Sequence, residues 1–125
     1  METVSPAIAR MRACLGAPPG AVGSPLPSAK GVTLYKVMGK MFAILTTYPI
    51  EGVILKCDPH LAEMLRSKYA GVGRRGHLDP RFWISIDLHA DVPLSEVEQL
   101  AASAYDLVRA KLTRKQKAEL ELLSS

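Results

Sequence analysis

Four short segments of the chain have hydrophobic patterns that predict β-strands: three are rich in β-branched and aromatic residues, and in the fourth the side chains of alternate positions form two faces, one of them buried. Three of these segments follow one another, separated by short turns, and therefore predict an antiparallel meander. The Met38-Gly39 pair is a candidate two-residue turn, because glycine readily adopts positive φ. The four predicted strands are residues 32–37, 40–47, 52–57 and 82–88.

Apolar residues recur every three or four positions near both ends of the chain and once in the middle, which predicts helices. Ser5-Pro6 and Asp58-Pro59 begin two of them, because each pair combines a capping side chain with a proline at the first helical position. Ser95 and Glu98 have the spacing of a capping box at the start of the longest helix, and Thr113 begins the last. Strands in the middle and helices at the ends predict an α+β fold: an antiparallel sheet of hairpins flanked by N-terminal and C-terminal helices.

Two segments show neither the strand pattern nor the helix pattern and contain several glycines. Residues 17–31 hold four prolines and three glycines, and we expect a loop. Residues 71–80 predict a second flexible connection. The length of 125 residues and a hydrophobic content of 48% are typical of one globular domain spanning residues 1–125.

The longest uninterrupted apolar run, residues 41–45, is far shorter than a membrane span. We therefore expect no membrane segment and a cytoplasmic protein. Candidate metal ligands are scattered rather than clustered, so no metal and no cofactor is predicted. They are Cys14, Cys57, His60, His77 and His89.

Two further motifs carry little chemistry. The glycines of Gly71-x-Gly-x-x-Gly76 have the spacing of a dinucleotide fingerprint but follow a helix, whereas that mechanism needs a strand leading into a helix. Cys57 is predicted to be a small buried residue, and its neighbour Lys56 leaves a reactive thiolate as the alternative.

The net charge of +4 is the remainder of larger blocks. Residues 82–108 carry five acids and no base, and residues 109–117 carry five bases and no acid. Residues 66–81 form another basic block, whose cations are able to bind phosphates or are simply solvated. Its basic members are Arg66, Lys68, Arg74, Arg75 and Arg81, with His77 among them. Trp83 follows this block and either stacks on a base or packs against a helix.

Four short pieces, taken in order and spacing over about residues 7–122, resemble the MmcQ/YjbR-like family of small bacterial proteins. They are Val37-x-Gly-Lys-Met-Phe-Ala43, Leu55-Lys-Cys-Asp-Pro59, Trp83-Ile-Ser-Ile-Asp-Leu88 and Ala104-Tyr-Asp-Leu-Val-x-Ala-Lys-Leu112. The resemblance implies a double-wing α+β fold and a DNA-binding function that rests on fold analogy. It places Lys40, Lys56, Cys57, His77 and Trp83 on recognisable family positions, and it implies no catalytic residue.

Three functions follow as hypotheses. The first is a non-enzymatic DNA-binding protein that contacts phosphates through the basic loop at residues 71–81, with Lys40, Lys56 and Trp83 as further candidates. The second is an accessory domain that binds a protein partner or forms a homodimer, using the acidic block or an apolar helix face. The third is an enzyme or small-ligand binder centred on Lys56, Cys57 and His77. Convergence of the basic clusters with Lys40 or Lys56 on one face would favour the first.

Overall fold

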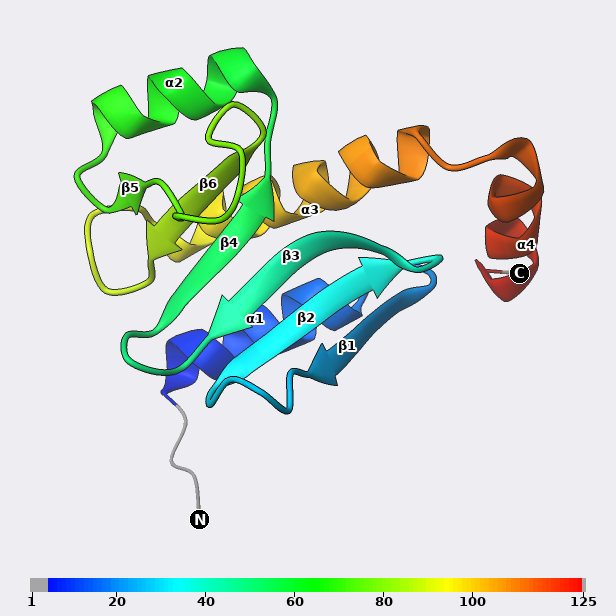
Figure 1. Cartoon of the computed structure of the whole chain (residues 1–125), viewed down its shortest axis with the longest axis horizontal. Helices are drawn as coiled ribbons and strands as arrows, with labels where there is room; N and C mark the ends of the chain where they lie inside the picture. Colours follow the sequence, from blue (N-terminus) through cyan, green and yellow to red (C-terminus); the bar gives the residue numbers. More distant parts are fainter. Residues whose placement is uncertain (1–4, 125) are drawn as a thin grey trace.

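The computed structural model describes residues 5–124 and shows helices packed around one twisted antiparallel sheet (Figure 1). The helices are α1 (Pro6–Gly16), α2 (Pro59–Lys68), α3 (Leu94–Ala110) and α4 (Arg114–Ser124). The strands are β1 (Ala21–Pro25), β2 (Val32–Val37), β3 (Lys40–Thr46), β4 (Gly52–Lys56), β5 (Val72–Gly73) and β6 (Trp83–Asp87). The α+β fold with terminal helices is thereby confirmed.

The sheet has the strand order β1-β2-β3-β4-β6-β5, and every neighbouring pair is antiparallel. Helices α1 and α3 lie against one face of the sheet, α2 lies beside β5 and β6, and α4 follows α3 at the far end (Figure 1). The core lies between the sheet and helices α1 and α3. Its largest fully buried side chains include Ile8, Met11, Leu15, Phe42, Leu45, Leu55, Ile84 and Ile86.

Both proline-containing helix starts are confirmed. Ser5 Oγ accepts a hydrogen bond from the amide of Ile8 at 3.2 Å, and Pro6 occupies the first turn of α1. At α2, the Asp58 carboxylate accepts from the amides of His60 at 3.0 Å and Leu61 at 3.3 Å. Each cap satisfies amides that have no partner within the helix.

The predicted capping box at α3 is wrong. The helix begins one residue earlier, after Pro93, whose carbonyl accepts from the amides of Glu96 and Val97. Glu98 instead accepts a hydrogen bond from Arg10 of α1 at 2.6 Å, so a partner remote in sequence takes the side chain that the local motif needs. The motif at Thr113 is real, because Thr113 and Gln116 exchange side-chain-to-amide hydrogen bonds of 3.0 and 3.1 Å.

The predicted loop at residues 17–31 is wrong in part, because β1 forms within it and pairs along β2. An edge strand needs only backbone partners, so this segment pairs without an apolar pattern. Gly23 lies against the Tyr35 ring, where an added Cβ would lie 2.6 Å from Cε1. The connection at residues 71–80 likewise contains the short strand β5, which pairs with β6.

Alanine substitutions at two glycines have opposite expected effects. Gly23→Ala forces Tyr35 to move and should lower the free energy of unfolding by about 1–3 kcal/mol. Gly16→Ala is the matched control, since a Cβ there meets nothing within 4 Å at the end of α1, and it should be neutral or raise stability by up to about 1 kcal/mol. Urea unfolding of both variants measures the difference, and equal stabilities would contradict the packing of β1 described above.

Candidate nucleic-acid interface

Three arginines from different parts of the chain line one surface groove. Arg66 lies in the last turn of α2, Arg74 follows β5, and Arg81 precedes β6. The groove measures about 390 Å³, and we call it the arginine groove; it is lined by Pro59, Glu63, Arg66, Ser67, Arg74 and Arg81. Pairing of β5 with β6 brings the sequence-distant arginines together, so half of the predicted basic block shares one site.

Arg66 is the half-buried member of this group. Its Nη1 nitrogen is closed off from solvent and has no hydrogen-bond partner within residues 5–124. A buried donor without an acceptor costs about 1–3 kcal/mol, more when the group is charged. An anion that entered the groove would supply the missing acceptor.

Arg81 already has a partner. Its guanidinium donates to both carboxylate oxygens of Asp79, the shortest contact being 2.8 Å from Nη2 to Oδ2. Hydrogen bonds from the Arg81 side chain and backbone lower the pKa of Asp79 to about 2, with a smaller contribution from the charge of Lys56. Asp79 therefore lies within electrostatic reach of both cations and neutralises part of their charge.

Lysines extend the cationic surface beyond Asp79. Lys56, at the end of β4, is close enough to Lys111 for the two charges to repel; partial burial and this repulsion lower the pKa of Lys56. The ammonium of Lys40 lies 3.5 Å from the backbone oxygen of Lys111. These residues form a series in which each member contacts the next or lies within electrostatic reach of it. We call this series the basic belt, and its members are Arg81, Asp79, Lys56, Lys111 and Lys40.

The other predicted contact residues lie differently. Lys68 places its ammonium 5.1 Å from the centre of the Tyr69 ring, and Arg75 and His77 are exposed on the segment between β5 and β6. Trp83 is only 8% exposed and its ring is 5.1 Å from the Lys56 ammonium. Base stacking on Trp83 is therefore blocked in this conformation, and the packing alternative describes it better.

The acidic block is largely used within the chain. Asp91 accepts from the amides of Ala70 at 2.8 Å and Gly71 at 2.7 Å, and these bonds lower its pKa. Asp87 accepts from the amide of His89 at 2.9 Å, and Glu98 pairs with Arg10. These carboxylates hold turns and helices together instead of forming a continuous acidic docking surface.

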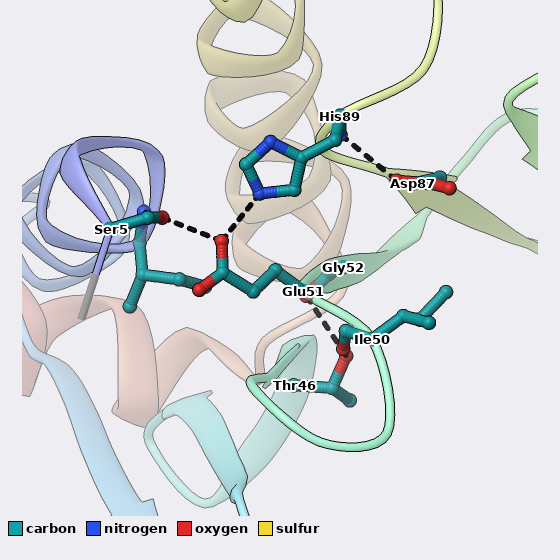
Figure 2. A network of polar contacts seen from close by, with 8 residues as sticks. Ser5, Thr46, Ile50, Glu51, Gly52, Asp87 and His89 are labelled. Carbon is teal, nitrogen blue, oxygen red and sulfur yellow. Dashed lines mark hydrogen bonds and ion pairs between the residues drawn. The ribbon is translucent and has the colours of Figure 1, made fainter. Parts of the chain in front are cut away.

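Glu51, on the connection between β3 and β4, joins three segments in a polar network that the sequence patterns did not reveal (Figure 2). Ser5 donates its hydroxyl to Glu51 Oε1, and His89 Nε2 donates to the same oxygen; both distances are 2.5 Å. These bonds, that of Ser5 first, hold the pKa of Glu51 below its usual value. The network ties the start of α1 and the turn after β6 to the sheet.

The remaining sequence motifs do not form a reactive thiol, a dinucleotide site or a metal site within residues 5–124. Cys57 is buried, and burial raises the pKa of its thiol, which disfavours the thiolate. Gly71 and Gly73 lead into an extended segment and then β6 rather than a helix, so the dinucleotide geometry is absent there. Within residues 5–124, no three His, Cys, Asp or Glu side chains are grouped for a metal ion. Nor does any helix of the described chain have the length and apolar character to cross a membrane.

The architecture defines a small class of α+β proteins in which two helices cover one face of a strongly twisted antiparallel sheet. The YjbR family model matches residues 18–107, and the chain belongs to this family. The Deinococcus radiodurans protein DR2400, described as a DUF419 domain, is 25% identical with a TM-score of 0.81, covering 91% of this chain and 87% of its own. A Pseudomonas syringae protein shares the fold at 20% identity and a TM-score of 0.62, covering 70% of this chain and 86% of its own. No curated protein matches.

Glu51→Gln should lower the free energy of unfolding by about 1 kcal/mol at neutral pH, because the amide loses the charge that Ser5 and His89 stabilise. The folded-state pKa of Glu51 is depressed, so its contribution is complete above the unfolded-state pKa and is lost as the pH falls through the folded value. Denaturant unfolding of wild type and variant should therefore differ at pH 7 and converge as the pH falls through the depressed folded-state pKa of Glu51. Glu119→Gln, on the exposed face of α4, is the control and should show no such pH-dependent difference.

Proposed function

We propose that this protein binds nucleic acid through the phosphate backbone, with the arginine groove as the principal contact and the basic belt as its extension. The observation that carries the proposal is the convergence of Arg66, Arg74 and Arg81 on one groove in which a buried Arg66 nitrogen lacks an acceptor. Guanidinium groups bind phosphate oxygens with two parallel hydrogen bonds, which suits them to this role.

The arrangement of charge supports the same function. Lys56, Lys111 and Lys40 continue the cationic surface from Asp79 to the hairpin between β2 and β3. Contacts to phosphates supply affinity and orientation but no sequence information, so we propose binding with little sequence preference. No catalytic step is part of the proposal, in keeping with the buried, weakly acidic Cys57 thiol.

Asp79 acts as an internal competitor in this proposal. In the free protein its carboxylate forms an ion pair with the Arg81 guanidinium, although the Arg81 side chain is 73% exposed. An exposed pair of this kind is worth at most about 1 kcal/mol, so a phosphate is able to displace it.

Arg74→Ala combined with Arg81→Ala should reduce the salt dependence of duplex binding, because both side chains line the arginine groove. Each phosphate contact contributes about 0.9 to the slope of log K against log salt, so the double variant should lower the slope by up to about two. Fluorescence anisotropy with a short mixed-sequence DNA duplex, titrated at several salt concentrations, measures this slope.

The matched control is Lys115→Ala with Lys117→Ala, which removes the same charge from exposed positions of α4 outside the groove and the belt. Its slope should equal that of the wild type. Equal losses in both double variants would show general charge attraction and overturn the arginine groove as the site. Absence of binding at low salt would overturn nucleic-acid binding altogether, and a dimer in light scattering would then favour the accessory-domain alternative.

Asp79→Asn should strengthen binding, because the amide retains the turn contact to the Arg81 backbone while releasing its guanidinium. Affinity at fixed salt should rise by up to about fivefold, because the phosphate no longer has to displace a pair worth at most about 1 kcal/mol. Glu119→Gln makes the same charge change on α4 and should leave the affinity unaltered. If both variants behave alike, Arg81 does not contact the nucleic acid.

A further inference from the structure

A second depression lies between α2 and α3, and it shares no residue with the arginine groove. Its volume of about 390 Å³ is in the range of small-molecule sites, which measure roughly 300–1,000 Å³. We call it the α2–α3 cavity; it is lined by Lys56, Cys57, Asp58, Leu61, Ile84, Leu100, Ser103, Asp106, Leu107 and Ala110.

Rigid elements form this cavity. Cys57, Ile84 and Leu100 are buried and belong to the hydrophobic core. Leu107 and Ala110 follow Ser103 on α3 at helical spacing, so they share the face that Leu61 of α2 opposes across the cavity. An apolar group would therefore find a preformed site with little ordering cost.

Four polar residues accompany the apolar lining, and one of them, Asp58, already has a structural role. The Asp58 carboxylate is bound by two amides at the start of α2. Lys56 has no ion-pair or hydrogen-bond partner among residues 5–124; its ammonium lies 5.1 Å from the Trp83 ring and 5.4 Å from the Phe82 ring. The ammonium is partly buried near Lys111 and has no carboxylate in direct contact, and Asp79, within electrostatic reach, neutralises only part of its charge. An anion in the cavity would therefore find a cation to pair with.

We propose that the α2–α3 cavity binds a small amphipathic organic anion, consisting of an aromatic or branched acyl group with one carboxylate. The apolar group lies against Leu61, Ile84 and Leu107, and the carboxylate pairs with Lys56. Asp106 at the cavity disfavours a second negative charge, so the ligand is a monoanion. The cavity shares Lys56 with the basic belt but no residue with the arginine groove, and its test contains no nucleic acid.

Three naphthalene derivatives of nearly equal shape test the charge of the ligand: naphthalene-1-acetate, naphthalene-1-acetamide and 1-(aminomethyl)naphthalene. Isothermal titration calorimetry at pH 7 should give one site per chain and the highest affinity for the acetate, about 3–10-fold above the amide. The amine should bind most weakly. Tightest binding of the amine would overturn the anion preference and assign the charged contact to Asp106.

Two pairs of variants locate the site. Ser103→Phe fills the cavity and should abolish binding of the acetate and the amide, whereas Ala102→Phe, at the neighbouring exposed position, should retain both. Lys56→Met should lower affinity for the acetate to that for the amide. Lys30→Met is its control, because Lys30 also lies over an aromatic ring, 4.9 Å from the centre of Tyr48, but does not line the cavity.

Thermal unfolding must show that Ser103→Phe remains folded; if it does not, Ala110→Trp at the exposed rim makes the same test. Unchanged binding in a folded cavity-filling variant would overturn the site. Unchanged acetate affinity in Lys56→Met would overturn the role of Lys56, and absence of binding by all three probes would overturn the proposal as a whole.

Discussion

The contact between Phe42 and Tyr105 joins three parts of the molecule. Phe42 is the extra residue of an irregular pairing between β2 and β3, and both Phe42 and the next residue, Ala43, belong to the core. Its ring meets Tyr105 of α3 edge to face, with centroids 5.5 Å apart and planes at 87°. The Tyr105 hydroxyl then donates to the backbone oxygen of Pro19 at 2.5 Å. The sheet, α3 and the segment before β1 are therefore joined through one aromatic pair.

Local chemistry predicts those parts of the fold whose partners are close in sequence. Ser5 and Asp58 cap the helices that they precede, and Met38-Gly39 forms the tight turn, with φ of 50° and 81°. Strand β1 escaped prediction because it has no apolar periodicity and is stabilised by pairing with β2. The prediction of a capping box at Ser95 was wrong because a residue remote in sequence binds the Glu98 side chain: Arg10, 88 positions earlier, donates a hydrogen bond to it.

The candidate site shows the same division. Charge blocks identify Arg66, Arg74 and Arg81 as candidates, but only the pairing of β5 with β6 shows that they share a groove. The approach of Lys56 to Lys111 depends on how α3 crosses the sheet, which no sequence spacing encodes. The Asp79–Arg81 pair has a local spacing of two residues, but the charge pattern gave no reason to expect that Arg81 is already paired.

Helix α4 lies beyond residues 18–107, the part that matches the family, yet its Leu120 belongs to the hydrophobic core that this part forms. Leu120 is fully buried, and a Cβ at Gly20, whose φ is +73°, would lie 2.4 Å from its Cδ1 atom. Glycine at position 20 thus serves two needs, the left-handed backbone and the space for a leucine 100 positions later. In the evolution of such chains, loss of the C-terminal helix would remove one of these constraints, so glycine at position 20 and the presence of the helix should be inherited together.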